Sequence, residues 1–260
     1  MSAGTISVAR AVLRRTIIHT YKNPAIIVPS LAFPLVFLLA FAGGLSAVSS
    51  VPGFDFAAGY TAFQFIFVFL QMGAFGGIFT GFRLAEDFES GFARRLLVGA
   101  PDRTGLVIGY VLAGLVRYCL IGVLLWAIAL LAGMDVLGGV LDVVGIVALG
   151  ALINIACTLW VLGLAFRYQT VDVGSSMQTP VFVLLFLAPV YVPLALLTGW
   201  LHTAASINPV TPIVNAARGF ISGDPEQVAL SFALGFAFIA LTAVWAVTQL
   251  RRALRGPAAA

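Results

Sequence analysis

The chain has 260 residues, of which 61% are hydrophobic and only 9% are charged, and its formal net charge is +4. A soluble domain carries about 25% charged residues, so this composition excludes a water-soluble globule and indicates a polytopic membrane protein. The basic excess does not indicate nucleic-acid binding, because the arginines lie beside apolar stretches and form no patch interleaved with aromatic side chains.

The N-terminal segment 5–22 is predicted to form an amphipathic helix. Its apolar residues recur at helical spacing: Ile6, Ala9, Leu13 and Ile17. Basic side chains fall largely on the other side, which suits a helix that lies in the membrane interface with its cations near the headgroups. Residues 1–24 are therefore expected to be an interfacial helix that precedes the membrane domain.

Six membrane-spanning helices are expected within a membrane domain that covers residues 25–250. Each apolar stretch is near the ~20 residues that a spanning helix needs; the stretches are 25–46, 60–82, 106–132, 142–166, 178–198 and 227–249. An all-α fold is expected because unpaired backbone groups are costly in lipid, and the alternating strands of a barrel are missing from the sequence.

The distribution of basic residues predicts the orientation. An even number of spans places both termini on one side, together with the loop 83–104 and the tail 251–260. These segments and Arg167 carry nearly all the Arg and Lys residues, whereas Arg218 stands alone on the opposite face. The positive-inside rule then makes that side cytoplasmic. The preference for Arg over Lys is typical of a GC-rich genome, so we expect a bacterial cytoplasmic membrane.

The loop 83–104 holds a third of all charged residues and separates two apolar spans. So polar a loop, with its own Leu pair, indicates a docking element for a soluble partner. An alternative is that its acidic residues Glu86, Asp87 and Glu89 bind Mg²⁺, as in membrane prenyltransferases. No second acidic motif completes such a site, so we expect no metal centre.

The second and fifth spans contain the candidates for a translocation pathway. The second has a small-xxx-small pattern at Gly73, Gly77 and Gly81, which permits close helix approach, either within the chain or at a subunit interface. The fifth carries three prolines, Pro180, Pro189 and Pro193, and is expected to be kinked or broken. The candidate pathway residues are Gln64, Phe67, Gln71, Phe75, Phe182 and Phe186, with lipid-facing phenylalanines as the plainer alternative.

Arg117 and Asn154 are polar residues inside predicted spans, where either a structural or a functional role is open. Catalytic motifs are missing from the sequence. The sole lysine, Lys22, is followed by Asn23, so there is no phosphate-binding P-loop, and neither a His-Glu-x-x-His nor a Gly-x-Ser-x-Gly motif occurs. We therefore expect a non-catalytic protein without a bound cofactor. The rival hypotheses are a membrane enzyme acting on lipids and a passive channel.

Two segments resemble the ABC-2 type permeases of ATP-driven exporters, and within them the daunorubicin-resistance type of drug and lipid exporter subunit. The first, 86–103 (EDFESGFARRLLVGAPDR), is similar to the family's acidic–Gly–Leu-Leu–Pro–Arg loop after the second span. The second, 208–220 (NPVTPIVNAARGF), is similar to its Asn-Pro…Arg segment before the last span. Asn23-Pro24 and Phe33-Pro34 at the first span add a weaker match. This chain departs from many members at Phe92 and Asp102.

This resemblance implies a permease that moves an amphipathic drug or lipid outward, or alternatively a polysaccharide or glycolipid. Two permeases, identical or homologous, would join two copies of a separate ABC ATPase subunit, which would hold ATP and Mg. The residues implied to couple to the ATPase are Glu86, Glu89, Gly91, Arg94, Leu96, Leu97, Pro101 and Arg103. Segment 199–226 would re-enter the membrane from outside, with Asn208, Pro209 and Arg218 at the outer gate.

Overall fold

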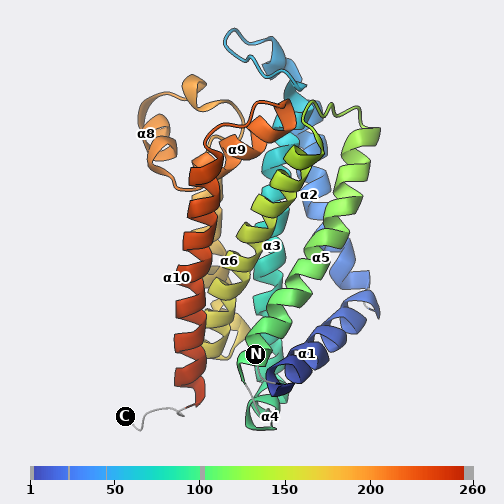
Figure 1. Cartoon of the computed structure of the whole chain (residues 1–260), viewed down its shortest axis with the longest axis vertical. Coiled ribbons are helices and arrows are strands. Elements are labelled where there is room, and N and C mark those ends of the chain that lie inside the picture. The colour runs from blue at the N-terminus through green and yellow to red at the C-terminus, as the bar shows by residue number, and fades with distance from the viewer. Residues whose placement is uncertain (1–2, 23, 45, 100–102, 255–260) are drawn as a thin grey trace.

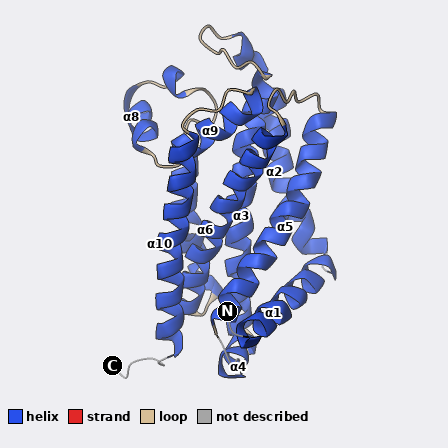
Figure 2. Cartoon of the chain, viewed as in Figure 1, coloured by secondary structure: helices blue, strands red, loops and turns tan. Residues whose placement is uncertain are grey.

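The computed structural model describes residues 3–22, 24–44, 46–99 and 103–254, and their regular structure is entirely helical (Figure 2). The all-α prediction is therefore confirmed for this part of the chain. The α-helices are α1 (Ala3–Lys22), α2 (Pro24–Gly44), α3 (Gly59–Glu89), α4 (Phe92–Gly99), α5 (Thr104–Leu131), α6 (Val140–Tyr168), α7 (Gly174–Phe186), α8 (Gly199–Ile207), α9 (Thr211–Ser222) and α10 (Val228–Leu254). Short 3₁₀ turns follow α2, α6 and α7.

Four of the described helices, α3, α5, α6 and α10, are long and apolar enough to cross a membrane. They match the predicted second, third, fourth and sixth spans to within a few residues, apart from the C-terminal ends of α3 and α10. Helix α2 coincides with the predicted first span and includes a shorter apolar stretch, Leu31–Ala40. The count of six spans stays a prediction, since α7 has only 13 residues.

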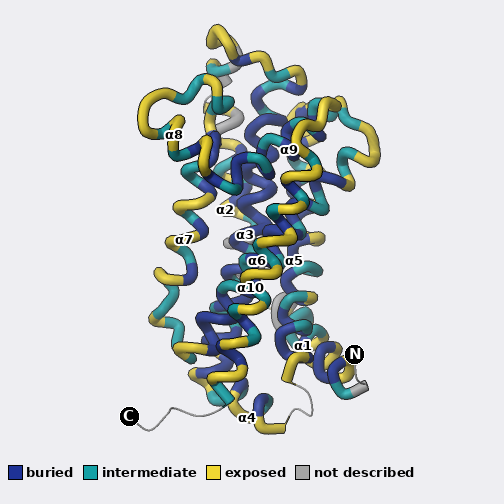
Figure 3. The backbone as a smooth tube through the Cα atoms, turned by 60° about the vertical axis from the view of Figure 1, so that its left-hand side comes forward, coloured by how far each residue is buried: buried dark blue, intermediate teal, exposed yellow. Residues whose placement is uncertain are grey.

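Helix α3 forms the centre of the bundle and packs against α2, α5 and α6, while α10 packs along α6 (Figure 1). The buried residues follow α3 along most of its length, whereas the outer helices are exposed on one side (Figure 3). Helices α1 and α4 and the C-terminal end of α10 lie at one end of the bundle. Helices α8 and α9 lie at the other end (Figure 1).

Glycines let α3 and α6 approach closely. A Cβ atom at Gly77 would lie 2.7 Å from the backbone N of Thr158, and one at Gly81 would lie 2.5 Å from the Val161 side chain. Gly73 likewise faces the backbone of Gly150. The small-xxx-small pattern of α3 therefore serves packing within the chain, the plainer of its two interpretations.

The N-terminal helix is seated on α5 in the same way. Gly105 and Gly109 leave space for Val8 and Val12, which are buried, while Ile6 is 54% exposed. The buried face of α1 is therefore shifted from the predicted apolar stripe. The reason is steric: the two glycines of α5 make a shallow groove that admits β-branched side chains, and periodicity within α1 alone does not reveal it.

Helices α3 and α7 end at other residues than the predicted second and fifth spans. Helix α3 continues seven residues beyond the expected end of the second span, so Glu86, Asp87 and Glu89 lie on its last two turns, not in a loop. The reason is that neither Gly nor Pro occurs between the expected end of the span at residue 82 and Gly91. Helix α7 ends at Phe186, and the chain from 187 to 193 is irregular, which agrees with the expectation that the proline-rich fifth span is broken.

Candidate functional site

A short helix at the end of α3 forms the tip of the predicted coupling segment. Gly91 adopts a φ of +72°, a left-handed conformation that glycine allows at little cost, and reverses the chain into α4. Ala93 and Leu97 on α4 are buried. Arg94, Arg95 and Val98 face outward, and Val98 is 84% exposed.

The two leucines of the coupling segment are in different environments. Leu97 is buried in the main core, whereas Leu96 is half-buried against its edge. The Nε of Arg103 donates a hydrogen bond to the Leu97 carbonyl oxygen at 3.0 Å and so holds the end of α4 near the start of α5. Pro101 lies outside the described residues.

Asp87 joins three helices at this end of the bundle. Its two carboxylate oxygens accept hydrogen bonds from the two terminal nitrogens of Arg15 on α1, each at 2.7 Å, and the hydroxyl of Tyr110 on α5 donates to it at 2.6 Å. The Arg15 guanidinium also lies 3.8 Å above the ring of Phe92 on α4. The hydrogen bonds to Asp87 raise the pKa of Arg15 above its ordinary value, so this cation stays charged.

The neighbouring carboxylates have other partners. Glu89 accepts hydrogen bonds from the Thr170 hydroxyl at 2.9 Å and from the Val171 backbone N–H at 2.8 Å, which ties α3 to the α6–α7 connection. Glu86 pairs with Arg83 one turn earlier at 2.6 Å. The three acidic residues therefore diverge, and within the described ranges no three His, Cys, Asp or Glu side chains gather closely enough to hold a metal ion.

At the opposite end, Arg218 on α9 binds the backbone where α7 has broken. Its guanidinium donates to the carbonyl oxygens of Pro189 at 2.6 Å, Val190 at 2.9 Å and Phe63 at 3.3 Å. It also lies 3.3 Å from the centre of the Phe63 ring. Arg218 is 4% exposed, so a buried cation occupies the place of the helical hydrogen bonds that the irregular segment lacks.

Asn208 acts beside Arg218. Its side-chain nitrogen donates to the Leu184 carbonyl oxygen at 2.6 Å, and its side-chain oxygen accepts from the Val210 N–H at 2.9 Å. In a continuing α-helix the Leu184 carbonyl would accept from the Ala188 N–H. Here the Ala188 N–H donates instead to the Leu185 carbonyl in a tighter turn, so Asn208 supplies the donor for Leu184. Pro209 is half-buried between α8 and α9.

The candidate pathway residues gather on α3 and α7. Phe75 and Phe182 have ring centroids 4.7 Å apart, and Phe186 contacts both Phe67, at 5.5 Å, and Phe182, at 5.6 Å. Phe33 and Phe37 of α2 extend this aromatic cluster.

The two amides of this region are buried beside the aromatic rings on α3. Gln64 donates to the Tyr60 hydroxyl at 3.1 Å. Gln71 is 1% exposed, and neither of its amide atoms has a hydrogen-bond partner. A buried amide without partners is costly, so Gln71 is a group that a bound polar atom would satisfy.

The polar residues of α5 and α6 bind backbone oxygens of the α3 glycine face. Arg117 donates to the carbonyl of Gly76 and to the Thr80 hydroxyl, and Asn154 donates to the Gly73 carbonyl at 2.8 Å. Glycines leave these carbonyls accessible from the side. Arg117 and Asn154 therefore have structural roles in joining the three helices.

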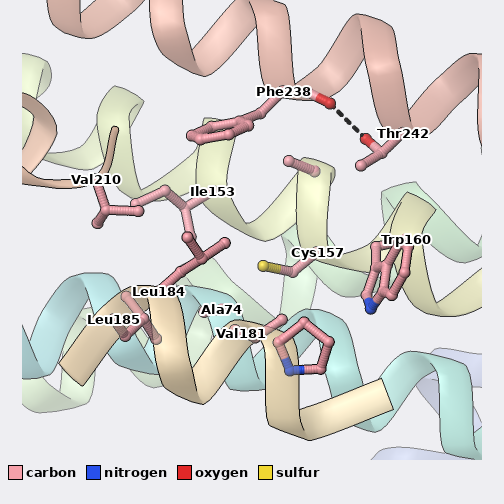
Figure 4. Close-up of a pocket in the computed structure, with 12 residues that line it drawn as sticks. Ala74, Ile153, Cys157, Trp160, Val181, Leu184, Leu185, Val210, Phe238 and Thr242 are labelled. Atoms are coloured by element: carbon pink, nitrogen blue, oxygen red, sulfur yellow. Dashed lines mark hydrogen bonds between the residues drawn. The ribbon is translucent and has the colours of Figure 1, made fainter. Parts of the chain in front are cut away.

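An apolar cavity of about 240 Å³ lies between α3, α6, α7 and α10 (Figure 4). Cys157 and Trp160 of α6 line one side, and Phe238 and Thr242 of α10 line another. The Thr242 hydroxyl donates to its own helix at Phe238, so it offers no free donor to the cavity. The volume and lining suit an acyl chain or a small apolar group.

The family model for the ABC-2 type transporter matches residues 8–221. The chain belongs to the ABC-2 type transporter family. The match extends from α1 to the last turn of α9, and so includes both ends of the bundle described above. Comparison with curated proteins found no match.

As an ABC-2 protein, the chain is the membrane component of an ABC transporter, a class that works with an ABC ATPase subunit. The described residues of the predicted coupling set lie at one end of the bundle, and the predicted gate residues Asn208, Pro209 and Arg218 lie at the other. Sequence reasoning missed Arg15 and Tyr110. Their signal is weak, because a basic residue on an interfacial helix and a tyrosine near the start of a span are common in membrane proteins of every function.

Proposed function

We propose that this ABC-2 chain is the permease subunit of an exporter that moves an amphipathic drug or lipid out across the cytoplasmic membrane. Two permeases, identical or homologous, pair with two copies of an ABC ATPase, which holds ATP and Mg. The chain itself supplies no catalytic group. A polysaccharide or glycolipid is the alternative cargo.

The observation that carries this proposal is the attachment of α4. Its outer face is exposed, and α4 itself is held by Arg15 against the Phe92 ring and by Arg103 at the Leu97 carbonyl. The last turn of α3, which leads into α4, is joined to α1 and α5 through Asp87 and to the α6–α7 connection through Glu89. A push on α4 by a partner would therefore be transmitted to four helices of the bundle instead of bending a loop. Such rigid attachment is what a coupling helix needs, because nucleotide-driven movement must reach the membrane helices.

The aromatic cluster between α3 and α7 supports an amphipathic cargo. Ring faces offer apolar contact without a fixed hydrogen-bond pattern, and Gln71 offers one unpaired amide among them. A sugar polymer would need many polar partners along its path. In the proposed cycle the cargo passes this cluster, and the Asn208–Arg218 region closes the outer side.

The outer face of α4 is the place to test ATPase docking. We expect Val98→Asp to abolish co-purification of a P-loop ATPase, because a charge replaces an exposed apolar contact at the tip of the helix. The measurement is mild-detergent purification of the tagged chain from its native membrane, followed by mass spectrometry of the bound proteins. Leu125→Ala on α5 is the folding control: it should lower the free energy of unfolding by about 2–4 kcal/mol through loss of core packing, while the ATPase is retained.

If both the Val98→Asp and the Gly91→Pro variants retain the ATPase, α4 is not the docking site for the ATPase. Gly91→Pro is informative because the positive φ at this position is closed to proline, so α4 must change direction. The protein should still insert, since residue 91 lies outside the apolar spans.

Orientation is tested separately by thiol labelling. Asp55 and Ser90 are both exposed and lie near opposite ends of α3. Each is replaced by cysteine in a variant that lacks Cys119 and Cys157. We expect an impermeant thiol reagent added to intact cells to label position 55 and not position 90. Labelling at position 90 alone would invert the proposed topology.

A further inference from the structure

A basic cavity of about 730 Å³ lies at the α4 end of the bundle, between α4, the end of α6 and the end of α10. Four exposed arginines line it, Arg94, Arg103, Arg167 and Arg252, and no acidic residue is among the described residues of its lining. None of the four forms an ion pair with a carboxylate among the described residues. Four like charges around one cavity create a positive potential that attracts an anionic group, although water and salt screen it in part.

The wall of this cavity contains an unpaired polar group. Gln249 on α10 is 2% exposed, and its side-chain oxygen has no hydrogen-bond partner. A buried amide oxygen needs a donor, which a bare phosphate diester does not supply but a hydroxyl group does. The cavity therefore fits a ligand that carries an anionic phosphate and a hydroxyl close together.

Apolar side chains complete the lining. Phe88, Leu97 and Phe166 are buried at its inner wall, and Leu254 contributes from α10. A site for a free, fully hydrated anion would be lined mainly by polar groups, whereas an amphiphile presents an apolar portion next to its headgroup.

The surface of α10 continues this pattern away from the cavity. Leu241, Val244, Thr248 and Arg252 are spaced so that they share one face of the helix, and Leu241 and Val244 are 69% and 66% exposed. Two exposed apolar side chains thus lie on the same face of the spanning helix as the cavity arginine, with Thr248 between them and Arg252. This is the order of groups in a phospholipid that lies against the helix with its headgroup at the basic end.

We propose that this cavity binds the headgroup of an anionic phospholipid of the phosphatidylglycerol type. Arg252, Arg167 and Arg94 surround the phosphate, and Gln249 accepts a hydrogen bond from the glycerol hydroxyl. Basic pockets between spanning helices at the cytoplasmic side bind anionic headgroups in this way. Because α4 forms one wall, the bound lipid also stabilises the position of that helix.

The test uses the full-length chain, purified with any ATPase that accompanies it and then stripped of lipid in detergent. Native mass spectrometry measures retention of phosphatidylglycerol and of phosphatidylcholine with the same acyl chains. We expect phosphatidylglycerol to bind more tightly, and Arg252→Gln to weaken it roughly fivefold. Arg251→Gln is the matched control, because this neighbouring arginine is exposed like Arg252 but does not line the cavity. Arg167→Gln provides a second variant from another helix.

Four results would overturn the proposal. The first is equal binding of the two lipids, and the second is equal weakening of lipid binding by Arg251→Gln. The third is full displacement of the lipid by millimolar inorganic phosphate. The fourth is loss of the ATPase from Arg252→Gln while lipid binding stays unchanged. The third result would make this a site for a free anion, and the fourth would make it a protein-docking site. Lipid binding by the chain without any ATPase would support the proposal even if the exporter assignment failed.

Discussion

Asp87→Ala is expected to lower the free energy of unfolding by about 3 kcal/mol. The substitution removes the acceptor of two hydrogen bonds from Arg15 and one from Tyr110, and hydrogen bonds to charged groups are each worth roughly 1.5–3 kcal/mol. The expected loss is smaller than the sum of the three hydrogen bonds, because Arg15 is partly exposed and can bind water in place of Asp87. Thermal unfolding of the purified protein should show a decrease of roughly 5–10 °C.

Glu86→Ala is the matched control for Asp87→Ala. It removes a carboxylate one position away that pairs with Arg83 on the same helix, and we expect a change below about 0.5 kcal/mol. Hydrogen exchange should separate the two variants further, with faster exchange in α1 and α4 for Asp87→Ala alone. Equal effects of the two substitutions would show that Asp87 does not hold these helices together.

Arg218→Lys is expected to destabilise the outer end of the bundle although it conserves the charge. The planar guanidinium reaches the carbonyls of Pro189, Val190 and Phe63 from three nitrogens, whereas an ammonium on a shorter stem cannot span all three. Each buried carbonyl left unpaired costs about 1–3 kcal/mol. We expect a loss of about 3 kcal/mol, and a larger loss for Arg218→Ala.

Export and stability should fall together for Arg218→Lys, because the irregular segment after α7 then loses its fixed position. Arg251→Lys, a change at an exposed position of α10, should leave both measurements unaltered. Wild-type thermal stability of Arg218→Lys would indicate that charge alone is needed at this position. That result would contradict a role for the planar shape of the guanidinium.

Composition and the lengths of the apolar stretches predicted the membrane-protein class, the all-helical fold and the positions of most long helices. Apolar stretches of about 20 residues have few options in a membrane other than α-helix, so α5 and α6 appear within two residues of their predicted positions. The family motifs also placed a coupling segment after α3. The resemblance implied a helix within this segment, and α4 lies there, separated from α3 only by Ser90 and by Gly91 with its positive φ.

Which polar residues act together became evident only from the packing of the helices against one another. Asp87 looked like one of three acidic residues in a solvated loop, yet it is buried because α1 brings Arg15 to it from 72 residues away. Arg218 looked like a lone cation at the outer surface, and it is instead a partner for carbonyls that the prolines of the fifth span leave unpaired. The periodicity of a sequence predicts which face of one helix is apolar. It does not predict which backbone carbonyls of another helix are left unpaired where that helix breaks, and these carbonyls determine which polar side chains bind there.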